Sequence, residues 1–156
     1  MNRHGMLILL ILATAALVAC DNAGKSETTI AQTPVADIPL DDNLGANFID
    51  GLGDYHFPIT TAVPEVQRWF DQGLMLAWGF NHDAAERSFL RGTEIDPDCA
   101  MCWWGASLVL GPHVNAGMEP ANNANAWTRL QRARELAGNT TAREQAFIQA
   151  LSARYA

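Results

Sequence analysis

Basic side chains are scarce in this sequence. Its 156 residues include 10 Lys and Arg against 17 Asp and Glu, so the formal net charge is −7. The shortage is greatest in residues 20–98, which carry 4 basic and 14 acidic side chains. An acidic surface gains nothing from counterion release at a phosphate backbone, so we expect no nucleic-acid partner. Anionic lipid headgroups would repel the same region.

Long apolar runs are also lacking, apart from one at the N-terminus from Met6 to Val18. At about 13 residues it is too short to span a bilayer, but it has the length of a signal-peptide core. It ends at Ala19-Cys20, and polar residues follow directly. This pattern resembles the bacterial lipobox, which implies cleavage after Ala19 and acylation of Cys20 by diacylglyceryl and palmitate groups. The alternative is an ordinary secretory signal cut at Ala19, with Cys20 left free.

An acylated Cys20 would anchor the mature chain to a membrane of the cell envelope. Asp21, directly after it, resembles an inner-membrane retention signal, so we expect the periplasmic face of the inner membrane. Residues 1–19 are thus the predicted lipoprotein signal peptide. Residues 20–54 lack periodicity and are rich in polar and turn-forming residues, which predicts a flexible tether. A few apolar residues around its end are expected to pack on the first helix: Phe48, Ile49, Leu52, Tyr55 and Phe57.

Helical periodicity begins at Pro64, a residue that a first helical turn tolerates. Apolar residues then recur at helical spacing as far as Phe80. Asn81-His82-Asp83 supplies capping candidates for a second helix from Ala84 to about Glu94, and Asp96-Pro97-Asp98 ends it. The two predicted helices form a hairpin of about 34 residues.

The spacing within this hairpin matches the tetratricopeptide (TPR) signature, which has a Trp, a Gly, a small residue, an aromatic and a Pro at fixed offsets. These positions hold Trp69, Gly73, Ala85, Phe89 and Pro97. Trp103 then recurs one repeat length after Trp69, but Ser107 replaces the glycine and a loop from His113 to Asn123 interrupts the second unit. A generic amphipathic bundle is the alternative.

A further helix is predicted after Thr141, which forms a capping box with Glu144. We therefore predict that residues 55–156 are all-α and form a right-handed TPR-like stack of helical hairpins, about two and a half repeats long. Such a stack buries its core between neighbouring repeats, so a short one should be marginally stable. We expect Phe147, Ile148 and Leu151 to be partly exposed at its open end.

The stretch from about Tyr55 to Ala156 also resembles one family of longer, exported bacterial TPR lipoproteins. The resemblance implies the fold but no defined chemistry, and it implies that the chain is a truncated N-terminal portion of a longer protein. It is carried by His56-Phe57-Pro58-Ile59-Thr60, Phe80-Asn81-His82-Asp83, Asp96-Pro97-Asp98-Cys99-Ala100-Met101-Cys102, Leu110-Gly111-Pro112 and Asn115.

In other TPR arrays, three positions of each first helix line a concave groove. By resemblance, the corresponding residues here are Gln67, Phe70, Leu74, Met101, Trp104 and Leu108. Aromatic and Met side chains on such a face suit an extended or helical peptide. The expected function is therefore a membrane-tethered scaffold that binds another exported protein or peptide. Alternatively, the N-terminal segment or further repeats cover Phe70 and Trp104.

Cysteines are few, and once Cys20 is set aside only Cys99 and Cys102 remain. A structural disulfide between them is expected in an oxidising compartment. The alternatives are a redox-active or metal-binding pair, which would make this a thiol redox or metal-handling protein, or two inert thiols. No βαβ pattern surrounds the motif, which argues against thioredoxin-like catalysis. Trp103 stands where covalent haem attachment would require a His.

Histidines offer little prospect of a metal site. His82 and His113 should lie at the opposite edge from the cysteines, since Cys102 and His113 are about 16 Å apart along a helix. His56 is on the cysteine edge and could complete a Cys2His site. His82 is interpreted as a turn residue, and His113, near Met118 and Glu119, is the better ligand candidate although a solvated loop also explains it. No nucleophile–base pair, phosphate loop or carboxylate dyad stands out, so we expect no enzyme, cofactor or metal.

Overall fold

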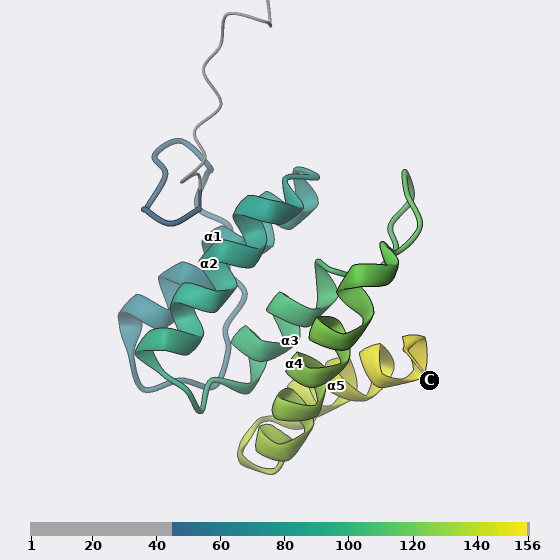
Figure 1. Ribbon diagram of the computed structural model, residues 1–156. Coiled ribbons are helices and arrows are strands. Elements are labelled where there is room, and N and C mark those ends of the chain that lie inside the picture. Colours follow the sequence, from purple (N-terminus) through teal and green to yellow (C-terminus); the bar gives the residue numbers. More distant parts are fainter. Residues whose placement is uncertain (1–44, 156) are drawn as a thin grey trace, which may run out of the picture. The chain divides into compact units, whose positions relative to one another are not determined.

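The computed structural model describes residues 45–155, and every regular element in that range is helical (Figure 1). The predicted all-α class is therefore confirmed for this part of the chain. The predicted signal peptide (1–19), Cys20 and the first part of the predicted tether lie outside the described residues. Within residues 45–155, no helix is both long and apolar enough to cross a bilayer.

The first hairpin consists of α1 (Pro64–Trp78) and α2 (His82–Ile95). α1 begins at Pro64, as predicted, because a proline in the first turn lacks only an N–H that would have no partner there. The Asn81 side chain caps α2 by accepting a hydrogen bond from the Ala84 N–H at 3.4 Å. Between the helices, Phe80 has a φ of 61°, which is unusual for a residue with a side chain.

The second hairpin consists of α3 (Ala100–Leu108) and α4 (Asn123–Leu136), with a short 3₁₀ turn, η2 (Pro120–Asn122), before α4. α3 ends just before Gly111-Pro112, and the predicted loop separates it from α4. The buried Ser107 hydroxyl donates to the Ala126 carbonyl at 2.8 Å. This bond ties the end of α3 to the start of α4, so the two helices stay in contact despite the loop between them.

Phe89 of α2 joins the two hairpins. Its ring is fully buried and lies against Gly73 of α1 and Gly105 of α3. A Cβ would come within 2.7 Å of this ring at Gly73 and within 2.5 Å at Gly105. Glycine at both positions therefore makes room for the aromatic ring. At the outer side of the same junction, Arg129 pairs with Glu86 at 2.6 Å.

The last helix, α5 (Ala142–Arg154), follows a second 3₁₀ turn, η3 (Ala137–Asn139). Its first turn contains the predicted capping box between Thr141 and Glu144. The expectation of a partly exposed end is wrong for Ile148 and Leu151, which are 2% and 4% exposed. Both side chains belong to the main core with residues of α3 and α4. Phe147 is 37% exposed, as expected.

Residues 45–54, which the sequence assigns to the tether, pack against the first hairpin. The Phe48 ring stacks on Trp69 at 4.0 Å, and Gln72 accepts from the Ile49 N–H at 2.8 Å. The buried Ser88 hydroxyl donates to the Gly45 carbonyl at 3.0 Å. Gly45 has a φ of 89°, and a Cβ there would collide with the backbone of α2. These residues are therefore part of the folded unit.

Candidate functional site

Three of the six predicted groove residues lie on α1 and three lie on α3. We call the surface formed by these six residues and the first turn of α5 the inner face. Four of them are buried and do not face solvent: Phe70, Leu74, Met101 and Trp104. Gln67 and Leu108 are half-buried. The inner face is thus an occupied surface in this structure, and its occupant is the chain itself.

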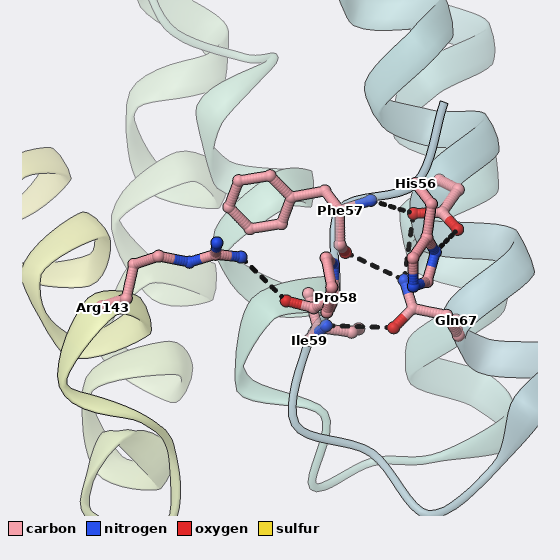
Figure 2. Close-up of polar contacts among 7 residues, drawn as sticks. His56, Phe57, Pro58, Ile59, Gln67 and Arg143 are labelled. Carbon is pink, nitrogen blue, oxygen red and sulfur yellow. Dashed lines mark hydrogen bonds and ion pairs between the residues drawn. The ribbon is translucent and has the colours of Figure 1, made fainter. Parts of the chain in front are cut away.

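That occupant is the extended stretch His56 to Thr60, which we call the inner segment (Figure 2). On the α1 side, Gln67 holds two residues of its backbone. The Gln67 amide donates to the Phe57 carbonyl at 3.0 Å and accepts from the Ile59 N–H at 3.0 Å. Asp71 accepts from the Phe57 N–H at 3.1 Å and also bonds the His56 ring at 2.8 Å.

On the other side, α5 holds the inner segment through its first turn. Arg143 donates to the Pro58 carbonyl at 3.1 Å, and its guanidinium lies 4.1 Å above the Phe57 ring (Figure 2). Glu144 accepts from both the N–H and the hydroxyl of Thr60, each at 2.6 Å. The inner segment therefore bridges the first and the last helix of the described fold.

Aromatic rings fill the space beneath the inner segment. Phe57 lies 6.0 Å from Phe70 and 5.6 Å from Phe147, which in turn lies 5.7 Å from Trp104. The Trp104 indole N–H donates to the Phe147 carbonyl at 3.1 Å. The alternative interpretation of the groove is thus correct for Phe70, which Phe57 covers. Trp104 is covered by α5.

Glu144 is the most highly coordinated polar group in this region, with its side chain 1% exposed. Besides Thr60, it accepts from the N–H of Thr141 at 2.8 Å and from the Thr141 hydroxyl at 2.6 Å. Burial by itself would raise the pKa of this carboxyl, but the hydrogen bonds from Thr141 and Thr60 outweigh it, so the pKa is lowered from its ordinary value. Glu144 is therefore a carboxylate at neutral pH.

Cys99 and Cys102 form a disulfide at the N-terminus of α3, and both residues are fully buried. The Cys99 sulfur also accepts from the Cys102 N–H at 3.1 Å, so it caps the helix. The bond packs against Val66 and is partly covered by Ile59 and Ile95. A thiolate from another protein cannot reach either sulfur without opening this cluster.

The predicted ligand histidines are not near the cysteines. His56 lies against Asp71, and the part of the chain that the structure describes holds no group of three or more His, Cys, Asp or Glu that could bind a metal. His82 and His113, which the sequence places in separate turns, are in edge-to-face contact with ring centroids 4.3 Å apart. Burial and the neighbouring His113 lower the pKa of His82.

Sequence reasoning missed three contributors to these sites. Asp71 and Arg143 hold the inner segment, but both carry charge at solvent-side helical positions and give no sign of a distant partner. Trp78 was not singled out, although it is 66% exposed at the end of α1. Two predictions from the sequence do point to the inner segment: Phe57 is expected to pack on the first helix, and the N-terminal segment is an alternative cover for Phe70.

Comparison with known proteins adds no family assignment. No protein-family model matches this sequence, and neither the search of curated proteins nor the search of solved structures finds a match.

Proposed function

We propose that this protein is a membrane-tethered scaffold of the TPR type, which binds an extended segment of another exported protein on its inner face. In this proposal the helical hairpins form a right-handed TPR-like stack, and Cys20 carries the lipid anchor at the periplasmic face of the inner membrane. The observation that supports it best is the inner segment, because α1 and α5 already hold an extended chain there by side-chain contacts to its backbone.

Backbone recognition of this kind does not depend on the sequence of the bound segment. The Gln67 amide satisfies one carbonyl and one N–H of the inner segment, as a sheet edge would. Specificity then comes from one apolar side chain, Phe57, which enters between Phe70 and Phe147. A partner segment with an aromatic residue before a proline could make the same contacts once the inner segment has left.

The proposed role is binding and not catalysis. The polar side chains of the inner face are committed to holding backbone groups or to capping α5. The alternative role, thiol redox or metal handling through Cys99 and Cys102, has weaker support because both sulfurs are bonded to each other and buried.

A peptide-exchange experiment on the full mature chain tests the proposal. The probe is a fluorescent peptide with the sequence of residues 54–62, and its anisotropy reports binding. A Phe57→Ala, Thr60→Ala double variant loosens the inner segment and alters no side chain of α1, α3 or α5. We expect it to bind the peptide at least tenfold more tightly than wild type, whose inner face is occupied.

Two further variants locate the binding surface. Adding Gln67→Ala to the loosened variant should abolish most of the gain. Adding Gln131→Ala should not, because Gln131 is a half-buried residue of α4 whose amide bonds Arg134 at the surface. A partner captured from envelope extracts by the loosened variant should be displaced by the same peptide. Equal peptide binding by wild type and loosened variant, or indifference to Gln67→Ala, would show that the inner face is not a peptide site.

A further inference from the structure

A second surface of the molecule, which shares Leu108 with the inner face, has the features of a small-molecule site. It is a cavity of about 270 Å³ between the turn that joins α1 to α2 and the loop that follows α3. Its walls are mostly apolar and come from both hairpins: Trp78, Phe80, Leu108, Pro112 and Val114. The volume is just below the range typical of sites for drug-sized ligands, so it suits a smaller molecule.

The side chains at its mouth are unusually exposed for apolar groups. Trp78 is 66% exposed, Phe80 57% and Val114 87%. Phe80 also has its φ of 61°, a conformation that is unfavourable in a residue with a side chain. This conformation keeps the Phe80 ring beside His82 and His113, 6.3 Å from each, instead of in the core. Strain together with exposure on the same ring is typical of binding sites.

One cation faces this cavity, and it comes from the far end of the chain. Arg154, at the end of α5, lines the wall, and its guanidinium carbon lies 3.3 Å from where a Cβ of Gly111 would be. The absence of a side chain at Gly111 therefore lets the guanidinium reach the cavity. Arg154 forms no ion pair with the described carboxylates, and no Asp or Glu of the described range lines the cavity.

The polar groups nearby do not neutralise this cation. Asp83 and Glu119 line the adjoining cavity on the other side of the two histidines. His82 has its pKa lowered by burial and by His113, so it adds no positive charge at neutral pH. The cavity thus combines apolar walls with one guanidinium that pairs with no carboxylate of residues 45–155, and a guanidinium can bind a carboxylate through two parallel hydrogen bonds.

We propose that this cavity binds a small monocarboxylate with an apolar chain or ring. The carboxylate lies on Arg154 above Gly111, and the apolar part lies between Trp78 and Phe80. Apart from Leu108, this site shares none of the six groove residues, and it does not depend on the scaffold function.

The probes for the test are hexanoate and two matched compounds of the same chain length, hexanol and hexylammonium. Binding to the full mature chain is measured by calorimetry and by saturation-transfer NMR. We expect saturable binding of hexanoate, at least tenfold weaker binding of hexanol, and none of hexylammonium. Arg154→Gln should weaken hexanoate binding at least tenfold, and Trp78→Ala should remove the saturation transfer from the aromatic resonances.

Arg134→Gln is the control, because Arg134 is another exposed arginine near a helix end and lies outside this cavity. It should leave hexanoate binding unchanged, and circular dichroism should show intact helices in all three variants. Equal binding of hexanoate and hexanol, tighter binding of hexylammonium, no effect of Arg154→Gln, or no binding at millimolar hexanoate would each overturn the proposal.

Discussion

At the scale of single residues, Glu144 is the polar side chain on which the described fold depends most. One buried carboxylate caps α5 through Thr141 and also holds Thr60 of the inner segment. Charged acceptors make stronger hydrogen bonds than neutral ones, and a buried donor left without a partner is costly. The fold therefore depends on this group at two places that are far apart in the sequence.

We expect Glu144→Gln to lower the free energy of unfolding by about 2–3 kcal/mol, because the amide presents an NH2 group to donors that need an acceptor. Urea unfolding followed by circular dichroism measures the change. The control is Glu135→Gln, which loses only an exposed pair with Arg132 and should change stability by less than ~0.5 kcal/mol.

The stability difference between wild type and Glu144→Gln should also depend on pH. The pKa of Glu144 in the folded protein is below its ordinary value of 4.5, so the carboxylate stabilises the fold above that pH. This contribution is lost as the pH falls through the folded-state pKa. The stability difference between wild type and Glu144→Gln should thus be largest near neutral pH and should shrink on acidification below about 4.5. A difference that grows on acidification would contradict this assignment.

At the scale of helices and turns, close approach at two glycines sets the spacing of α2 from α1 within the first hairpin and from α3 of the second. Gly105 and Gly73 leave room for the Phe89 ring, and any larger side chain would meet it directly. We expect Gly105→Ala to destabilise the fold by about 1–3 kcal/mol, although alanine favours a helix more than glycine. Thermal unfolding measures the loss.

Two comparisons distinguish overpacking from a general effect of the substitution. Gly138→Ala, where an added Cβ meets nothing within 4 Å, should be neutral or slightly stabilising. Combining Gly105→Ala with Phe89→Leu should cost less than the sum of the two single changes, since the smaller side chain relieves the clash. Strict additivity would show that the alanine does not meet Phe89.

The disulfide at the start of α3 acts at the same scale. It closes a ring of only four residues, so it restricts the unfolded chain only slightly, by about 2 kcal/mol in the loop-entropy estimate. We expect Cys99→Ala with Cys102→Ala to lower the unfolding free energy by about that amount and to leave peptide binding unchanged. Because both sulfurs are buried, a reductant such as dithiothreitol should break the disulfide, as detected by trapping of the released thiols, only after global unfolding. Rapid reduction of the folded protein by glutathione would revive the redox interpretation.

Local signals in the sequence predicted the helices well. Pro64 at the first turn, Asn81 as a cap, and the Thr141–Glu144 capping box each act within a few residues, and each appears where predicted. The long-range contacts could not be predicted in this way. The Thr60–Glu144 bond joins residues 84 positions apart, and the burial of Ile148 depends on α3 and α4 lying beside it.

At the scale of the whole described unit, the inner segment adds core between α1 and α5. α5 packs on α3 and α4, and the inner segment ties it to α1 as well. The proposed site and the stability of α5 therefore share the same contacts. Any partner that displaced the inner segment would also loosen the last helix.

Phe57→Ala tests this coupling, since Phe57 bridges Phe70 of α1 and Phe147 of α5. We expect faster hydrogen exchange at the amides of α5 than in wild type, with α2 unchanged, measured by mass spectrometry. His56→Ala serves as the matched control, because the exposed His56 ring contacts α1 through Asp71 only and should leave α5 protected. Unchanged protection of α5 in Phe57→Ala would show that α5 is stable without the inner segment.

The position of residues 45–60 also has a mechanical consequence. They lie between the predicted anchor and α1, so tension applied at the N-terminus reaches their contacts before it reaches any helix. Pulling should first release about 16 residues, or roughly 55 Å of extended chain, and only later unfold the hairpins. An optical-trap record should show this short early step when the chain is pulled from its N-terminus, at lower force in Glu144→Gln. A protein anchored in this way would uncover its inner face when it is stretched away from its membrane.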